Sequence, residues 1–237
     1  MSEERPDPDV PPAGLRRHLQ GHPSPRPAPK PGRVVGLAVA LVVLAVVAVW
    51  AAFSGVGPAR LDGAALAESI EERTPVRTSL AIAVTTLGST VAMALLAVAV
   101  GAWCWWRGRR ADAVLAVGAM AGASLVFRLL KVLLDRSRPP AADRLVVETN
   151  ESLPSGHATM SFVVVGTVVV LAWAGRGALG RVAMLVVAAA WIGAVGATRV
   201  YLGVHWVSDV LAGWAVGAAW LALCVILWLR WRARVPA

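Results

Sequence analysis

The sequence has 237 residues, of which 57% are hydrophobic and 16% charged, and its mean hydropathy is +0.65. Soluble domains usually contain about 45–50% apolar and about 25% charged residues, so this composition argues against a disordered protein, a collagen or a disulfide scaffold and favours a membrane protein. A net charge of +9 would suggest a nucleic-acid partner in a soluble protein. Here most basic residues flank apolar segments, so no nucleic-acid partner is expected.

The N-terminal segment 1–32 contains most of the fifteen prolines, and between Pro23 and Pro31 proline alternates with small or charged residues. Such a segment cannot bury a core, so we predict a disordered cytoplasmic tail. It is not expected to be a secretory signal peptide, because its charged lead is too long and the next apolar stretch is long enough to span a bilayer. Residues 33–237 are predicted to form one membrane domain.

Six apolar segments in this domain are of about the length that a bilayer requires. They are predicted to be transmembrane helices at 34–53, 80–103, 111–134, 157–174, 182–200 and 205–229. The expected fold is therefore all-α and polytopic. The polar segment 55–79 is predicted either as a short amphipathic helix on the membrane surface or as an ordinary loop. The apolar face of that helix would hold Leu61, Ala65, Leu66 and Ile70.

Basic residues are expected on one side of this bundle. If the N-terminus is cytoplasmic, the cytoplasmic segments carry the whole net charge of +9 and the opposite face is balanced, as the preference for positive cytoplasmic loops requires. Tryptophans favour membrane interfaces, and several fall at the predicted inner ends: Trp103, Trp105, Trp106, Trp173, Trp228 and Trp231. Both termini are therefore expected inside a cell membrane.

Three polar clusters fall at the predicted outer ends of the last four spans, where ionisable residues are costly and often functional. In the first cluster, Lys131 and Arg138 are seven residues apart. On one helix they would lie in line, two turns apart, and both could bind one anion. The alternative is that Lys131 snorkels to the interface and pairs with Asp135.

The second cluster is Pro154-Ser155-Gly156-His157, which opens the fourth predicted span. The free N–H groups at a helix start, together with the Ser155 hydroxyl, can bind an anion, and Gly156 lets a ligand approach the backbone. A simple helix cap is the alternative, but a cap would not require His157.

The third cluster contains Thr198 and Arg199, followed by His205 and Asp209. At a spacing of i, i+4, His205 and Asp209 would lie on one helical face, and a carboxylate on one imidazole nitrogen can make the other nucleophilic. A lone histidine at a membrane edge is more often structural, but this one has Arg199 and a second histidine nearby. The clusters lack the free carboxylates for Mg²⁺ or Ca²⁺ and a third histidine for catalytic zinc. Their excess of positive charge suits a phosphate, and one histidine to attack and one to protonate the leaving oxygen predict phosphoryl transfer without metal or cofactor.

In these residues the sequence resembles the type 2 phosphatidic acid phosphatase superfamily. The family pattern is Lys, six residues, Arg-Pro, then Pro-Ser-Gly-His, then Ser-Arg, five residues, His, three residues, Asp. The matching residues here are Lys131, Arg138 and Pro139, then 154–157, then Arg199, His205 and Asp209. Thr198 replaces the usual serine, and because threonine keeps the hydroxyl, phosphate contact is expected to survive.

The resemblance implies a metal-independent integral-membrane phosphatase acting on a lipid phosphate or diphosphate. The charge distribution predicts that its active site lies outside the cytoplasm. By the motif match, His205 is the nucleophile that forms a phosphohistidine, Asp209 orients it, and His157 is the general acid. The phosphoryl oxygens would be held by Lys131, Arg138, Ser155, Gly156 and Arg199.

Other functions remain open at this point. A lipid phosphotransferase would carry the same motifs, and a non-catalytic lipid-phosphate binder or transporter would not need two histidines and an aspartate. A vanadium haloperoxidase shares the phosphate-type site, but those relatives are soluble. The lipid itself remains open among undecaprenyl diphosphate, phosphatidic acid, phosphatidylglycerophosphate and prenyl-phospho-sugars. Membrane lipids are the other expected contact, and the sequence carries no signal for oligomeric state.

Overall fold

The computed structural model describes residues 31–234, and every regular element in that range is helical. The prediction of a disordered tail falls on residues 1–30, which lie outside the described residues, and on the first two residues of the first helix. The elements are α2 (Pro31–Ser54), η1 (Gly57–Leu61), α3 (Asp62–Glu71), α4 (Pro75–Leu87), α5 (Thr90–Trp106), α6 (Arg110–Leu134), η2 (Ala141–Asp143), α7 (Gly156–Ala172), α8 (Ala178–Tyr201) and α9 (Val207–Arg232).

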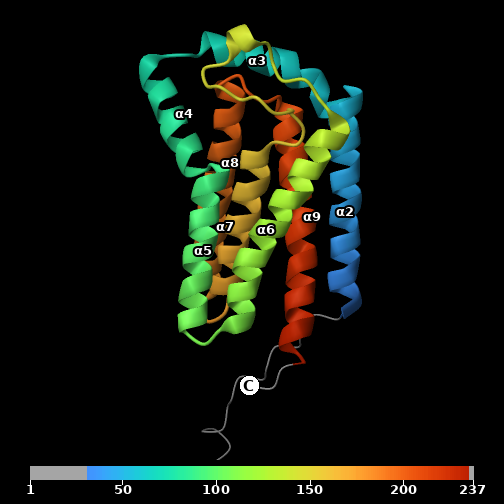
Figure 1. The fold of residues 1–237 in the computed structure, drawn as a ribbon, viewed down its shortest axis with the longest axis vertical. Helices are drawn as coiled ribbons and strands as arrows, with labels where there is room; N and C mark the ends of the chain where they lie inside the picture. The colour runs from blue at the N-terminus through green and yellow to red at the C-terminus, as the bar shows by residue number, and fades with distance from the viewer. Residues whose placement is uncertain (1–30, 235–237) are drawn as a thin grey trace, which may run out of the picture.

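The long helices run side by side in one bundle, with α2 at one edge against α9, and with α7 in contact with α5, α6, α8 and α9 (Figure 1). The main core lies between α5, α6 and α7, where Leu115, Phe127, Met160 and Val163 are buried. Helix α3 and the loop between α6 and α7 lie across one end of the bundle (Figure 1). Both termini of the described chain lie at the opposite end.

Membrane-spanning length and hydropathy are found in four helices, namely α2, α6, α8 and α9, and in a fifth span if α4 and α5 are counted together. Helix α7 is also apolar but has only 17 residues. The chain is therefore a helical membrane protein, in agreement with the predicted class. Five of the six predicted spans coincide with single helices to within a few residues.

The prediction of one continuous helix over 80–103 was wrong. The helix is broken after Leu87, and α4 and α5 meet at an angle of 44°. Gly88 ends α4, and the Ser89 side chain accepts a hydrogen bond from the Ala92 N–H at 3.2 Å, which caps α5. A Cβ at position 88 would lie 2.5 Å from a methyl group of Val195, so glycine at this position lets α8 approach closely.

The segment between the first two spans does form a short helix, α3. Leu66 is only 7% exposed, whereas Leu61, just before the helix, is 60% exposed. Helix α3 contacts α8 and α9, and its buried residues are Leu66 and the first residue, Asp62. The inner face of this helix is therefore partly polar, and its Asp62 was not part of the predicted apolar face.

Helices α7 and α9 meet along a seam of small residues. A Cβ at Gly213 would lie 2.9 Å from the Ser155 carbonyl oxygen, and one at Gly217 would lie 3.1 Å from that of Thr159. Glycines at i, i+4 thus let the two backbones approach closely, as is common in membrane helix pairs. The seam brings the start of α7 against the start of α9, where the Ser155 N–H donates to the Asp209 carbonyl oxygen at 3.1 Å.

Candidate active site

The three polar clusters of the sequence meet at one end of the bundle. The loop between α6 and α7 and the short α8–α9 connection form this end, and backbone hydrogen bonds hold them together. The Leu145 N–H donates to the Leu202 carbonyl oxygen at 3.0 Å, and the Ser152 N–H donates to the Arg136 carbonyl oxygen at 2.8 Å. Residues up to 78 positions apart in the sequence are therefore placed around one point.

Asp209 lies at the centre of the cluster and is fully buried, at 0% exposure. Its Oδ2 accepts hydrogen bonds from Ser152 Oγ at 2.5 Å and from the Trp206 N–H at 3.0 Å, and it lies 3.4 Å from His205 Nδ1. Oδ1 accepts a charge-assisted bond from Arg136. The carboxylate is thus fixed by four groups, of which the sequence identified only His205.

His205 pairs with Asp209 as predicted, but not on one helical face. Helix α9 begins at Val207, so His205 lies in the connection before the helix, and Asp209 lies in its first turn. The Nδ1 atom of His205 faces Asp209, and its Nε2 lies 3.1 Å from Arg138 Nη1. A proton on Nδ1 therefore leaves the Nε2 lone pair directed towards the cationic side of the site.

Burial, together with the positive charge of Arg138 and Arg199, lowers the pKa of His205 to about 3, although Asp209 acts in the opposite direction. An imidazole with such a pKa is neutral at physiological pH. A neutral imidazole has a free lone pair, which is the form that a nucleophile requires.

Arg138 extends from the α6–α7 loop towards His205. Its guanidinium donates to the carbonyl oxygen and side chain of Asn150 at 2.6 Å each and to the Val204 carbonyl oxygen at 2.5 Å. The prediction that Arg138 continues the line of Lys131 on a helix was wrong, because α6 ends at Leu134 and Asp135 has a left-handed backbone (φ 43°). The loop turns Arg138 towards the site.

Lys131 is buried, and its ammonium donates to the carbonyl oxygens of Glu151 and Ser152. No ion pair joins it to Asp135 within residues 31–234, so the snorkelling alternative for Lys131 is not what the structure has. Lys131 instead fixes the loop segment that leads into α7.

Arg199 is buried near the end of α8, and its guanidinium donates to Thr85 Oγ1 at 2.7 Å and to the Glu148 carboxylate. The same carboxylate lies 3.7 Å from the Arg138 guanidinium. An anionic group therefore already bridges the two arginines that were predicted to bind phosphate. Arg199 Nε is buried without a hydrogen-bond partner in the described chain.

The second predicted cluster forms the start of α7. Ser155 is the helix cap, and its Oγ accepts from the Ala158 N–H at 3.5 Å, which leaves its hydroxyl proton free to donate. A Cβ at Gly156 would lie 3.2 Å from the Phe127 ring, so this glycine has a packing role. His157 follows, close enough to interact with the charges of Arg199 and Arg138 and with His205. No hydrogen bond within residues 31–234 engages its imidazole.

The Thr198 hydroxyl donates to the Val195 carbonyl oxygen at 2.6 Å, within α8. Its proton is therefore occupied by the helix backbone. The contact with phosphate that was expected of this hydroxyl would need a different rotamer.

Sequence reasoning missed several residues of the cluster because they occupy none of the defining positions of the three motifs. Those in direct contact with the predicted site residues are Thr85, Arg136, Glu148, Asn150, Ser152 and, at one further step, Asp62. Arg136 lies within the first motif, between Lys131 and Arg138, where its charge was the available signal. Glu148, Asn150 and Ser152 lie in the α6–α7 loop, whose spacing predicts no common face. Thr85 lies on α4 and Asp62 begins α3, far from the motifs in the sequence.

A family model described as the PAP2 superfamily matches residues 112–233, which is more than half of the chain. The chain belongs to the PAP2 superfamily. The matched range contains all three motifs. The protein is accordingly a phosphatase of the PAP2 type.

One characterised protein from Bacillus subtilis and two crystal structures, from B. subtilis and Aquifex aeolicus, resemble this PAP2 phosphatase. Phosphatidylglycerophosphatase B of B. subtilis (strain 168) is 31% identical over 147 residues, covering 61% of this chain and 72% of that protein. The crystal structure of the transmembrane PAP2-type phosphatidylglycerolphosphate phosphatase from B. subtilis matches with a TM-score of 0.72 and 25% identity, covering 84% of this chain and 97% of that one. A. aeolicus LpxE matches in fold, with a TM-score of 0.53 and 21% identity over 72% of this chain and 95% of its own.

Proposed function

We propose that this PAP2 phosphatase dephosphorylates a lipid phosphate or diphosphate, without metal, through a phosphohistidine on Nε2 of His205. The observation that carries the proposal is the setting of His205, whose Nδ1 faces Asp209 while its Nε2 faces Arg138. An imidazole oriented by a carboxylate on one nitrogen is nucleophilic at the other. Arg138 marks the place where a phosphoryl oxygen would lie next to that nitrogen.

In the first step, Nε2 of His205 attacks phosphorus and the bond from phosphorus to the lipid oxygen breaks. His157 gives a proton to that oxygen, and Asp209 stabilises the proton held on Nδ1 of His205. In the second step, a water molecule gives a proton to His157 and attacks phosphorus, which releases inorganic phosphate and restores His205. Negative charge on the equatorial oxygens would be held by Lys131, Arg138, Ser155, Gly156 and Arg199.

Two further features support an anion site. Arg199 Nε is a buried donor without a partner in the described chain, and a bound phosphoryl oxygen would provide one. The Glu148 carboxylate bridges Arg138 and Arg199, as an anionic ligand would. Both arginines are nearly inaccessible, with side chains 4% and 2% exposed, so their charges are poorly screened by water.

The proposed substrate is a lipid because the site lies at one end of a helical membrane bundle. The B. subtilis relative and the B. subtilis crystal structure are both described as phosphatases of phosphatidylglycerophosphate, which makes that lipid the first to test. Phosphatidic acid and undecaprenyl diphosphate are the other members of the panel.

We further propose six spans, with the bent pair α4 and α5 as one and the 17-residue α7 as another, in a phosphatase domain over 33–237 that follows a cytoplasmic tail. Both termini would be cytoplasmic and the site would face outside. Cation–π pairs at the end of the bundle away from the site support this orientation, since Arg favours the cytoplasmic side and Trp lies at membrane interfaces. These pairs are Arg107 and Arg109 with Trp103, Arg110 with Trp105, Arg181 with Trp173, and Arg232 with Trp228.

The test of the function is phosphate release from the lipid panel by the purified full-length chain in detergent with excess chelator. Turnover should persist, and vanadate should inhibit it by imitating the five-coordinate phosphoryl group. Activity that disappears in chelator and returns with Mg²⁺ would contradict the metal-independent mechanism. Release from none of the lipids would contradict the function.

The orientation can be tested by cysteine labelling in intact cells. Ala142 is exposed next to the site, and Ala174 is exposed between α7 and α8 at the opposite end. Ala142→Cys should react with an impermeant reagent from outside, whereas Ala174→Cys should react only after permeabilisation. The parent chain, in which Cys104 is buried, gives the background. The reverse pattern would overturn the outward-facing site.

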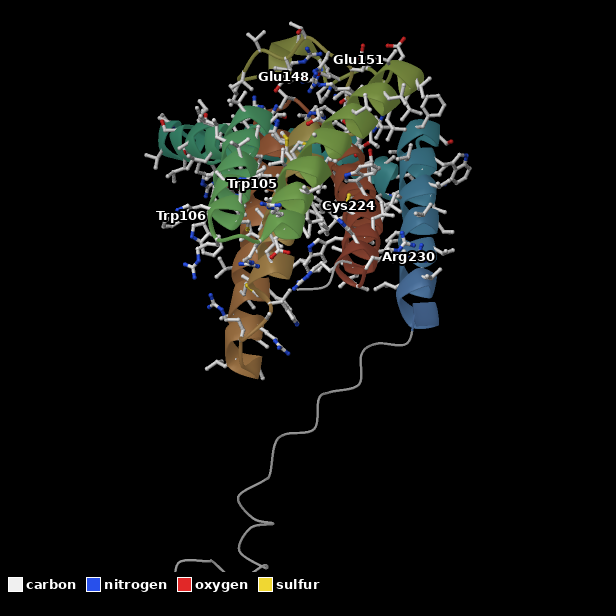
Figure 2. The ribbon with its side chains drawn as sticks, turned by 60° about the horizontal axis from the view of Figure 1, so that its bottom comes forward. Trp105, Trp106, Glu148, Glu151, Cys224 and Arg230 are labelled. Atoms are coloured by element: carbon white, nitrogen blue, oxygen red, sulfur yellow. The ribbon has the colours of Figure 1, made fainter. Side chains whose placement is uncertain are left out.

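Glu148 should compete with the phosphoryl group, because its carboxylate contacts Arg138 and Arg199. Glu148→Gln removes the negative charge and should tighten inhibition by vanadate about tenfold, or about 1.4 kcal/mol. Glu151 lies on the same loop (Figure 2) and serves as the matched control, since its contacts with Lys131 and Arg138 in the described chain use its backbone carbonyl. Weaker inhibition of Glu148→Gln would mean that Glu148 positions the arginines and does not compete.

A further inference from the structure

Arg136 lies on the side of Asp209 away from the proposed phosphate cradle. Its Nη1 donates to Asp209 Oδ1 and, at 2.8 Å, to Ser208 Oγ. The contacts of Asp209 with Ser152 and with His205 use the other carboxylate oxygen, Oδ2. Arg136 thus fixes one oxygen of Asp209 while the other faces the imidazole.

Asp62, the first residue of α3, holds Arg136 in turn. Its Oδ2 accepts from Arg136 Nη2 at 2.9 Å and from Ser208 Oγ at 2.6 Å, and its Oδ1 accepts from the Ser208 N–H at 2.9 Å. Asp62 is buried, at 6% exposure, so these bonds replace its hydration. The chain of contacts runs from α3 through Arg136 to the carboxylate that faces His205.

We infer that Arg136 and Asp62 are positioning residues of the reaction, which hold Asp209 in the orientation that aligns His205. A planar guanidinium can bond two carboxylates with separate nitrogens, which a lysine ammonium cannot do with the same geometry. One cation between two buried carboxylates also offsets their repulsion. Asp62 lies outside residues 112–233, the range that the family model matches, so this part of the apparatus is additional to the three motifs.

The inference rests on the proposed role of His205, and it gives α3 a function. This helix lies across the end of the bundle that holds the site (Figure 1). Helix α3 contacts α8 and α9, and Asp62 is its only charged residue among those that are buried. Contact with Arg136 therefore explains the buried Asp62 on the inner face of α3, whereas attachment to the membrane surface would not require a buried charge there.

The experiment compares kcat and KM of full-length variants on the lipid that the parent hydrolyses best. Arg136→Gln should lower kcat by about 10- to 100-fold, the loss expected when a catalytic group is misplaced by about 1 Å. KM and vanadate inhibition should change by less than about threefold, because Arg136 contacts none of the proposed phosphate ligands. Arg136→Lys should recover part of kcat. The control is Arg128→Gln, since Arg128 is exposed on α6.

Asp62→Asn should lower kcat in the same way, with the exposed Asp135→Asn as its control. Since Asp62 is inferred to act through Arg136, the double variant should be no slower than Arg136→Gln alone. If the parent is active and the Arg136 and Asp62 variants keep its kcat, the inference is wrong. It is also wrong if Arg136→Lys and Arg136→Gln lose kcat equally, or if the fold-losses of the two single variants multiply in the double variant. A parent without activity would overturn the proposed function instead. If Arg136→Gln fails to fold, Asp62→Asn and Arg136→Lys still decide.

Discussion

Replacing His205 by alanine is expected to reduce phosphate release by at least about 10³-fold, or about 4 kcal/mol of activation free energy, because the covalent step is lost. No phosphoenzyme should then form. Acid-labile, base-stable label on histidine, trapped by rapid quenching after mixing with radiolabelled lipid phosphate, measures this directly. The parent chain should show the label.

Asp209→Asn is the companion variant for His205. It keeps the size of the side chain, but its amide can favour the wrong imidazole tautomer, so label should form slowly and not disappear. Because Asp209 accepts from Ser152 and Arg136 as well, both variants need a thermal unfolding measurement beside the assay. Label that still appears in His205→Ala would show that another residue is the nucleophile.

Replacing His157 by alanine should lower activity by about 10²- to 10⁴-fold through loss of general-acid assistance. Unlike the loss at His205, this loss should shrink for a substrate whose leaving group needs little protonation, such as a nitrophenyl phosphate. The phosphohistidine should still form with that substrate. The measurement is the ratio of kcat/KM for the two substrates in the parent and in the variant.

Two other outcomes would contradict the roles assigned to His157 and His205. If His157→Ala abolishes the label with the activated substrate while His205→Ala does not, the two roles are exchanged. A loss at His157 that is equal for both substrates would point to binding and not to proton transfer. The free imidazole of His157, which no hydrogen bond engages in the described chain, is consistent with a group that acts only when substrate is present.

The sequence predicted the helical class and most helix positions because long apolar runs leave few alternatives in a membrane. It did not predict the break at Gly88 and Ser89. Gly and Ser are common inside membrane helices, so the sequence alone does not show that Ser89 caps a new helix or that Val195 packs against Gly88. The short helix α3 was predicted only as one of two alternatives, since its inner face combines Leu66 with the charged Asp62.

The predicted site residues do gather at one end, because motifs at helix ends share one depth whatever the loops between them do. Their exact relations were harder to predict. Lys131 and Arg138 were expected in line, but the left-handed Asp135 ends α6 between them. Glu148, Ser152 and Asn150 could not be found, since a loop has no periodicity from which a facing side can be inferred. Asp62 is 147 residues from Asp209, and only the fold brings it near.

The glycine seam between α7 and α9 limits how this enzyme can change. A Cβ at Gly213 or Gly217 would lie 2.9 or 3.1 Å from a carbonyl oxygen of the α7 segment, so these glycines let the helix that carries His157 approach the helix that carries Asp209. A larger side chain at either glycine would widen the site itself. Natural or engineered variants with a new lipid preference should therefore leave these two positions alone and accumulate their substitutions on helices that face away from the seam.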